Sequence, residues 1–296
     1  MLATNVRTAI ATTPLRLALP KGRMQDGVFA LLEGAGIQVR AGTRSYQPAL
    51  SAPGYVAKIL KPQNIVEMLH LGSRDAGFAG ADWVAELGAD VVEVLDTGLD
   101  PVRLVAAAPA ALLDGGALPA RRLVFASEYE RLTTRWIAAR GVDASCVRSY
   151  GATEVFPPED ADAIVDNTAT GSTLAAHGLV VLDEVLASST RFYANPRALE
   201  DPRRREAIDE LALLLRSVIE ARSRVMLEMN VSAERLDALV AVLPAMREPT
   251  VAPLHAGAGY AVKAAVRRVD LTRVLPAIKA SGGTDIVVTT FSQIVP

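Results

Sequence analysis

The sequence predicts an α/β protein with a mainly parallel sheet, followed by a smaller module of different pattern. Short apolar runs alternate with segments of helical periodicity along most of the chain, and half of the 296 residues are hydrophobic, enough to bury a large core. From about residue 225 the pattern becomes strand, helix, strand, strand, helix, strand within ~70 residues, as in a ferredoxin-like module. This length predicts two or three domains.

The expected elements follow from these patterns. Before residue 109 the strands are 15–20, 56–60, 76–80, 91–95 and 102–108, and the helices lie near 25–34, at 63–71 after Pro62, and from residue 82. After a linker-like stretch at 109–120 come strands 123–126, 147–149, 163–166, 180–182 and 192–194, with helices at 129–139 and about 202–226. The last module has strands 225–229, 250–254, 260–266 and 285–290, and helices 233–243 and 274–280.

Composition excludes several classes of function. The net charge is −2, with 31 Lys and Arg against 33 Asp and Glu, so nothing favours nucleic acid or an anionic membrane as partner. The single cysteine, Cys146, excludes an internal disulfide, which fits a reducing compartment. Residues 1–14 form a loose tail without the apolar core of a signal peptide, and no apolar run approaches a membrane span. We expect a soluble, cytoplasmic protein.

Metal-binding spacings are missing from the sequence. His70, His177 and His255 lie far apart, and neither C-x-x-C nor H-E-x-x-H occurs. A dedicated protein cage for a transition metal is therefore not expected.

The most informative segment runs from Asp166 to Leu174. It follows the apolar run 163–165 and precedes a helix, and such a strand–turn–helix can hold a phosphate on its N–H groups. Gly171 allows close approach of the backbone, and hydroxyl donors come from Thr168, Thr170, Ser172 and Thr173. Asp166 suits a sugar hydroxyl or a metal-bound water better than the phosphate, because its negative charge repels that of the phosphate. A capped turn without any ligand is the alternative interpretation.

Several motifs occur in order along the chain. They are Leu19-Pro20-Lys21-Gly22-Arg23, Lys61-Pro62, Phe78-Ala79-Gly80-Ala81-Asp82, Ala161-Asp162-Ala163-Ile164-Val165-Asp166 leading into Thr170-Gly171-Ser172-Thr173-Leu174, and Glu248-Pro249-Thr250-Val251-Ala252-Pro253-Leu254. From about residue 15 to the end, the chain resembles the ATP phosphoribosyltransferase family in its long form. It departs from the family pattern after Glu154, where Val155-Phe156-Pro157-Pro158-Glu159 lacks the expected glycine.

The resemblance implies a fold. Two α/β catalytic domains would face each other across a cleft, in the manner of periplasmic binding proteins. Domain I would comprise 15–103 with 190–224, and domain II, carrying the phosphoribosyl-binding loop, 104–189. A ferredoxin-like (ACT-like) regulatory domain would occupy 225–296 and bind histidine. Long-form members assemble from dimers to hexamers and require Mg²⁺.

The resemblance also implies a reaction. ATP and 5-phosphoribosyl 1-pyrophosphate would give N1-(5-phosphoribosyl)-ATP and pyrophosphate, the first step of histidine biosynthesis, with feedback inhibition by histidine. Adenine N1 is unprotonated at neutral pH, so the site needs positioning and charge stabilisation rather than a strong base. Mg²⁺ would be held by pyrophosphate and water, without dedicated protein ligands.

Each implied role falls on a matching position. Lys21, Arg23, Glu154 and Asp166 would be catalytic, the first two toward phosphates and the acids toward ribose hydroxyls. The phosphoribosyl loop would be Asn167, Thr168, Ala169, Thr170, Gly171, Ser172, Thr173 and Leu174. Asp82 and Arg103 are candidate nucleotide or phosphate contacts, and Glu228, Asn230 and Thr250 are candidates for the histidine pocket.

Other interpretations of the same residues stay open. Lys21 and Arg23 can be surface charge at a turn, Asp82 can be a helix cap, and the last module can serve assembly alone. The chain could also be a bilobal small-molecule binding or sensor protein, or a paralogue with an altered acceptor. Release of pyrophosphate from ATP and the phosphoribosyl donor discriminates between these.

Overall fold

The computed structural model describes residues 14–42 and 46–295. All but the last residue of the expected tail, 1–14, lies outside the described residues. The chain divides into two compact units, Met1–Ala30 with Ile37–Ala212, and Leu31–Gly36 with Leu213–Pro296. Each unit is described by itself.

The first unit is built on an eight-stranded sheet of order β4-β1-β5-β10-β6-β9-β7-β8. The first lobe, as we call it, has the parallel strands β1 (Leu15–Pro20), β4 (Tyr55–Leu60) and β5 (Ala76–Gly80). The second lobe has the parallel strands β7 (Leu123–Ser127), β8 (Ala144–Arg148) and β9 (Ala163–Thr168). A separate two-stranded ribbon pairs β2 (Val39–Arg40) with β3 (Ala49–Leu50).

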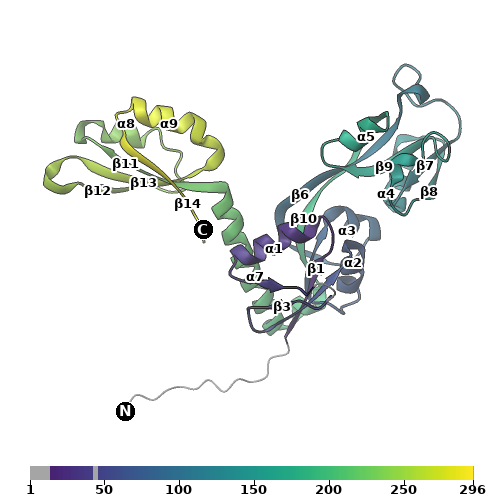
Figure 1. Ribbon diagram of the computed structural model, residues 1–296, viewed down its shortest axis with the longest axis horizontal. Coiled ribbons are helices and arrows are strands. Elements are labelled where there is room, and N and C mark those ends of the chain that lie inside the picture. The colour runs from purple at the N-terminus through teal and green to yellow at the C-terminus, as the bar shows by residue number, and fades with distance from the viewer. Residues whose placement is uncertain (1–13, 43–45, 296) are drawn as a thin grey trace, which may run out of the picture. The chain divides into compact units, whose positions relative to one another are not determined.

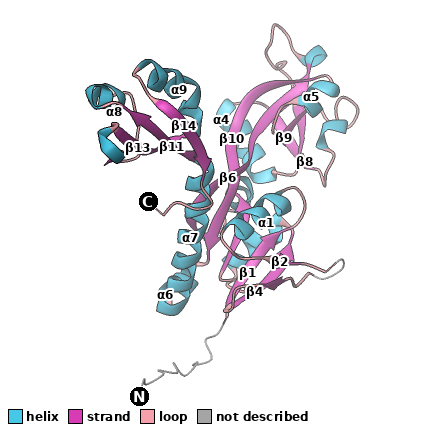
Figure 2. Ribbon diagram, turned by 60° about the vertical axis from the view of Figure 1, so that its left-hand side comes forward, coloured by secondary structure: helices cyan, strands magenta, loops and turns pink. Residues whose placement is uncertain are grey.

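Two long strands join the lobes. β6 (Val92–Pro109) and β10 (Leu179–Ala194) run antiparallel and side by side, as both ribbon views show (Figures 1 and 2). The sequence patterns predict each of them as two separate runs, and predict a mainly parallel sheet. The sheet is instead mixed, because β10–β5, β10–β6 and β6–β9 are antiparallel.

Side-chain hydrogen bonds explain why β6 continues through a polar stretch that resembles a turn. The hydroxyl of Thr97 donates to the carbonyl of Thr190, and the hydroxyl of Ser189 donates to Asp96 at 2.7 Å. Gly98 takes a positive φ of 65°, which glycine adopts without strain. The segment therefore stays paired with β10.

Except for the short helix at 196–200, which the sequence patterns do not predict, the helices lie close to their expected places. They are α1 (Met24–Gly34), α2 (Pro62–His70), α3 (Ala81–Leu87), α4 (Glu130–Arg140), α5 (Ser172–Ala176), α6 (Pro196–Glu200) and α7 (Pro202–Ser223). Proline stands at the start of α2, as predicted. The long helix ends at Ser223 rather than near residue 226, because β11 begins directly after it.

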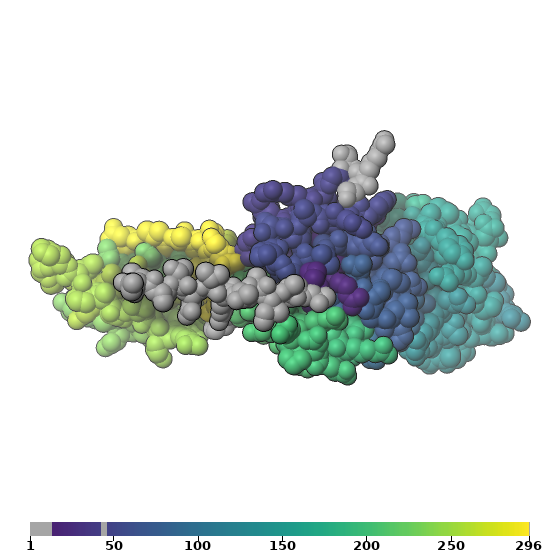
Figure 3. Space-filling view, turned by 90° about the horizontal axis from the view of Figure 1, so that it is seen from below, coloured from purple at the N-terminus to yellow at the C-terminus, as the bar shows by residue number. Residues whose placement is uncertain are grey.

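Each lobe has its own apolar core. Phe78 and Phe192 pack in the first lobe with ring centroids 4.9 Å apart, and Phe125 and Trp136 pack in the second at 5.5 Å. The surface of α6 and the start of α7 lies against the first lobe (Figure 3), where Arg204 of α7 forms an ion pair with buried Asp75 at 3.1 Å. This contact ties the returning chain to the lobe it left at β6.

The second unit carries a four-stranded antiparallel sheet of order β12-β13-β11-β14. Its elements are β11 (Arg224–Val231), α8 (Leu236–Val240), β12 (Thr250–Pro253), β13 (Tyr260–Arg267), α9 (Leu271–Ala280) and β14 (Thr284–Thr290). The expected helix at 233–243 is shorter, because its start is the 3₁₀ turn Ala233–Arg235. Leu227 and Val262 of the sheet pack with Leu239 and Ile278 of the helices.

In the described part of the chain, no helix combines the length and apolar character needed to cross a membrane.

Candidate functional site

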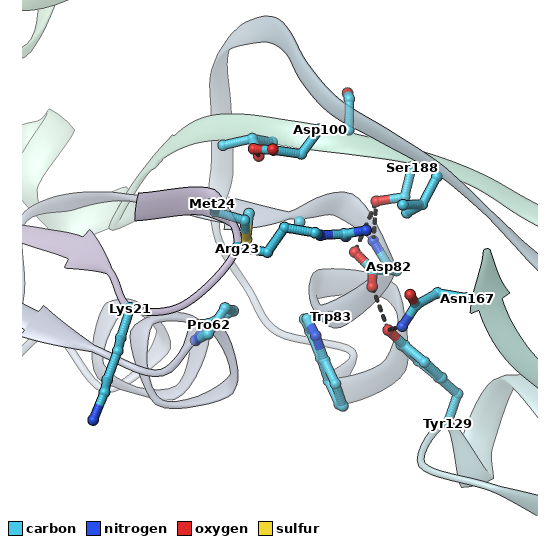
Figure 4. A pocket seen from close by; sticks show the side chains of 14 residues that line it. Lys21, Arg23, Met24, Pro62, Asp82, Trp83, Asp100, Tyr129, Asn167 and Ser188 are labelled. Atoms are coloured by element: carbon cyan, nitrogen blue, oxygen red, sulfur yellow. Dashed lines mark hydrogen bonds between the residues drawn. The ribbon is translucent and has the colours of Figure 1, made fainter. Parts of the chain in front are cut away.

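A cavity in the first unit collects polar side chains from both lobes and from β10 (Figure 4). Its lining residues are Lys21, Arg23, Met24, Pro62, Gly80, Asp82, Trp83, Asp100, Val102, Tyr129, Asn167, Ser188, Ser189 and Thr190. Four of the sequence-predicted positions therefore line one space although they come from three distant segments of the chain: Lys21, Arg23, Asp82 and Asn167.

Asp82 is a buried carboxylate with a complete set of partners. It follows the fully buried β5 and sits in the first turn of α3. One oxygen accepts from the hydroxyl of Ser188 at 2.7 Å and the other from the hydroxyl of Tyr129 at 2.6 Å. A Cβ at Gly80 would lie 2.1 Å from the Asp82 carboxylate, so only glycine fits there. A buried charge held in this way is fixed in position.

Tyr129 links Asp82 to the loop of the second lobe. Its side chain is fully buried and stacks on Trp83 with centroids 4.6 Å apart. Its hydroxyl accepts from the amide of Asn167 at 3.1 Å while donating to Asp82. Burial and the Asp82 carboxylate raise the pKa of Tyr129 well above its usual range, so the hydroxyl stays protonated.

The segment from Asp166 to Leu174 is a strand end, a turn and a short helix. The buried hydroxyl of Thr168 accepts from the N–H of Gly171 at 2.9 Å, and Gly171 takes a φ of 80°. The hydroxyls of Thr170 and Ser172 lie 2.9 Å apart on the exposed side of the turn. Helix α5 begins at Ser172, two residues earlier than the apolar pattern at Leu174 suggests.

The remaining members of this loop divide by exposure. Ala169 and Thr173 are exposed, whereas Leu174 is buried in the core of the second lobe. Thr168 is a structural part of the turn, and the hydroxyls of Thr170, Ser172 and Thr173 face solvent. The exposed hydroxyls are therefore the ones accessible to a ligand.

Asp166 has an unusual carboxyl group. It accepts the N–H of Asn167 at 2.7 Å. Burial, with a smaller contribution from the nearby acids Glu154 and Glu128, raises the pKa of Asp166 to about 6, against the opposing effect of the bond from Asn167. Glu154 lies on the 3₁₀ turn Thr153–Val155, close enough to act on Asp166 through space. The two predicted acids, Asp166 and Glu154, are thus close enough for their charges to interact.

The side chains of the predicted cationic residues point in different directions. Arg23 extends toward Asp82 across the cavity, whereas the side chain of Lys21 points away (Figure 4). The ammonium of Lys21 lies 5.2 Å from the ring centroid of Tyr46, a cation–π distance. Arg103 of β6 lies directly opposite Thr168 in the β6–β9 ladder and pairs with Glu184 at 3.7 Å on the surface.

Sequence reasoning missed Tyr129, Ser188 and Trp83. Tyr129 stands just after the carboxyl end of β7, where site residues of α/β sheets gather, and that position was an available signal. Ser188 begins a hydroxyl run on β10, but nothing local in the sequence indicates that it meets Asp82.

Among residues 14–42 and 46–295, no group of three or more His, Cys, Asp or Glu side chains converges as a metal site would require.

The predicted histidine-pocket residues share one face of the second sheet. Glu228, Lys263 and Thr250 are direct neighbours on β11, β13 and β12, and Lys263 donates to Glu228 at 3.1 Å. Asn230 donates to the carboxylate of Asp285 at 3.1 Å. Lys263 and Asp285 add charges of both signs that the sequence analysis did not include.

Known proteins match the chain along both units. Residues 61–217 match the family described as ATP phosphoribosyltransferase, and residues 221–293 match "HisG, C-terminal domain". The ATP phosphoribosyltransferases of Pelotomaculum thermopropionicum and Desulforudis audaxviator are each 38% identical to it, over 95% of this chain and 99% of theirs. A solved chain of the ATP phosphoribosyl transferase (HisG:HisZ) complex from Thermotoga maritima is similar with a TM-score of 0.60 and 25% identity, covering 68% of this chain and 98% of that one.

The α/β sheet and these relatives define the protein as a phosphoribosyl-transferring enzyme, a transferase of the glycosyltransferase type. The matches continue through the C-terminal module and cover nearly the whole length of the relatives. The chain belongs to the ATP phosphoribosyltransferase family, in its long form, and its place is in histidine biosynthesis.

Proposed function

We propose that the protein transfers the phosphoribosyl group of 5-phosphoribosyl 1-pyrophosphate to N1 of ATP, releases pyrophosphate, and is inhibited by histidine. The observation that carries the proposal is the cavity of the first unit, in which Arg23, Asp82 and Asn167 converge from three distant segments. A cation, a fixed carboxylate and the start of a hydroxyl-rich loop are what a phosphorylated sugar needs.

The donor's 5-phosphate is assigned to the loop. The exposed hydroxyls of Thr170, Ser172 and Thr173 supply donors, and Gly171 lets the turn form without a side chain. Asp166 accepts a ribose hydroxyl or a metal-bound water, and Glu154 is the second acid for the ribose. Arg103, opposite Thr168, adds positive charge beside the loop.

The pyrophosphate is assigned to the cationic turn after β1. Lys21 and Arg23 would stabilise the charge that develops on the leaving group. Mg²⁺ would share that charge, and since the described residues offer no group of three or more ligating side chains, pyrophosphate and water would supply most of its ligands. Adenine N1 attacks the anomeric carbon unprotonated, so the chain's task is to orient the two substrates.

We assign two catalytic domains and one regulatory domain. Catalytic domain I would comprise 15–103 with 190–224, domain II 104–189, and the regulatory ferredoxin-like (ACT-like) domain 225–296. The order strand, helix, strand, strand, helix, strand and the antiparallel sheet β12-β13-β11-β14 support the last of these. The two catalytic domains would form periplasmic-binding-protein-like lobes, and copies of the chain would assemble into dimers and hexamers.

Histidine is assigned to the exposed sheet face around Glu228, Asn230 and Thr250. The amino acid carries an ammonium, a carboxylate and an imidazole, and the face offers charges that complement them. Glu228 and Asp285 suit the cationic groups, and Lys263 suits the carboxylate. Asn230 brings no charge itself, but its amide donates to the neighbouring acid.

The test is a continuous absorbance assay of phosphoribosyl-ATP formation from ATP and the donor. We expect turnover that depends on both substrates and falls when histidine is added. Asp166→Asn is expected to lower turnover over donor KM, and exposed Asp160→Asn, six residues earlier and also removing one charge, is the matched control. No product from the two substrates would refute the proposed reaction, and an unchanged rate in millimolar histidine would refute the inhibition.

A further inference from the structure

Helix α4 of the second lobe is capped by a residue of the first lobe. Its own N-cap position is Tyr129, whose side chain makes no capping bond. The N–H groups of Arg131 and Leu132, in the first turn, donate instead to the two carboxylate oxygens of Glu86, each at 2.9 Å. Glu86 lies on α3, so a carboxylate from one lobe satisfies the helix start of the other.

The same two helices meet at further points. Trp83 of α3 stacks on Tyr129, and Asp82 of α3 accepts its hydroxyl. The guanidinium of Arg131 lies on Gly88 so closely that a Cβ there would come within 1.6 Å of its Nη1. Several specific interactions thus join α3 to the start of α4, and we call this contact the α3–α4 junction.

The ribbon that joins the lobes is irregular. The register of β6 against β10 shifts at five places, and each such irregularity interrupts the ladder and bends the strands locally. The α3–α4 junction adds direct contacts between the lobes beside this ribbon, to which Asp82 of α3 is itself bonded through Ser188 of β10. Its central residue, Tyr129, also contacts Asn167 at the start of the loop.

We propose that Glu86 is a positioning residue for the phosphoribosyl donor. By capping α4 from α3, it holds Tyr129 where one hydroxyl meets both Asp82 and Asn167. Glu86 does not line the cavity, so it acts on the donor through these residues and not by contact. This inference rests on the proposed function, because it takes the loop after Asn167 as the donor site.

The experiment measures donor binding to the full-length protein by calorimetry, with 5-phosphoribosyl 1-pyrophosphate as the probe. Glu86→Ala is expected to weaken binding about tenfold, within the range typical of coupling between two sites. Glu86→Gln keeps one acceptor and is expected to fall between wild type and Glu86→Ala. Thr134→Ala is the matched control, since Thr134 is exposed on α4 and bonds only within it, to the carbonyl of Glu130. It is expected to bind like wild type.

A double-mutant cycle separates positioning from a general loosening of α4. If Glu86 acts through the chain to Asn167, the losses caused by Glu86→Ala and Asn167→Ala are non-additive, because each breaks the same path. In steady state, Glu86→Ala is expected to raise donor KM more than it lowers kcat.

Three results would each overturn the positioning role. They are wild-type donor affinity in Glu86→Ala, an equal loss of affinity in Thr134→Ala, and additive losses when Glu86→Ala is combined with Asn167→Ala. Failure of the wild-type protein itself to bind the donor would overturn the proposed function, and is distinguishable because it precedes any comparison of variants.

Discussion

Donor binding is expected to weaken in acid because of Asp166. Burial, reinforced by Glu154 and Glu128, raises the pKa of its carboxyl to about 6. A ribose hydroxyl donates a stronger hydrogen bond to a carboxylate than to a carboxylic acid, so the ionised form is the one that binds the donor well. The donor affinity therefore titrates within the working range of an enzyme.

The size of the effect follows from the titration. With a pKa of about 6, roughly nine-tenths of the Asp166 carboxyls are ionised at pH 7 and about one-tenth at pH 5. We expect kcat/KM for the donor to fall about tenfold over these two pH units from this group alone. Asp166→Asn should lie about tenfold or more below wild type at pH 7, since a hydrogen bond to a charged group contributes about 1.5–3 kcal/mol.

The free energy of unfolding should change with pH in the direction opposite to the donor affinity. The pKa of Asp166 is higher in the folded protein than in the unfolded chain, so the native state binds more protons between about pH 4 and 6. The free energy of unfolding therefore falls as pH rises through this window, by about 1 kcal/mol between pH 5 and 7. Asp166→Asn removes this contribution, which denaturant unfolding without substrate at the two pH values would measure.

The kinetic assay needs saturating ATP, constant ionic strength and a series of pH values from 5 to 8. The donor's own phosphate also titrates near pH 6, so the decisive quantity is the difference between wild type and Asp166→Asn. An Asp166→Asn profile that falls in acid as steeply as the wild-type profile would refute this reasoning.

Three further perturbations have defined outcomes. Gly171→Val places a β-branched residue at a φ of 80°, so calorimetry should show loss of donor binding with the circular dichroism spectrum kept, and unchanged affinity would remove the loop from the site. Asp75→Asn removes the buried carboxylate that pairs with Arg16 at 2.6 Å and with Arg204, and should lower the free energy of unfolding by about 1.5–3 kcal/mol in denaturant titrations, because both guanidinium groups keep access to solvent; a loss under about 1 kcal/mol would contradict the ion pair's importance. Asp285→Asn removes the carboxylate beside Asn230 and should raise the histidine concentration for half-inhibition about fivefold or more, whereas an unchanged value would place the effector elsewhere.

Local pattern was sufficient for the segment around Asp166. An apolar run followed by hydroxyl residues and glycine predicts a strand, a turn and a helix, and β9, the Gly171 turn and α5 lie there. These elements depend on residues within a few positions of one another. The same holds for the proline that starts α2, because its fixed φ acts locally.

Tertiary partners decided what the sequence could not. The polar stretch of β6 has the composition of a turn, but bonds to Ser189 and Thr190, about ninety residues away, keep it in the sheet. Tyr129 meets Asp82 across 47 residues and Asn167 across 38. A pattern within a short stretch of sequence gives no information about contacts between residues so far apart. The link between the lobes can therefore be seen only in the structure.

The return of β10 to the first lobe has a consequence for the order in which the nascent chain folds. β5 pairs with β10 through Gly80 and Thr190, so the β5 edge of the first lobe has no strand beside it until about 110 further residues are made. At ribosomal rates of about 5–20 residues per second, that edge waits roughly 6–20 s for its neighbour. The second lobe, whose three strands lie wholly between, is complete before the first. We therefore expect the second lobe to emerge as an early folded unit and the first lobe to be closed by the strand that follows it.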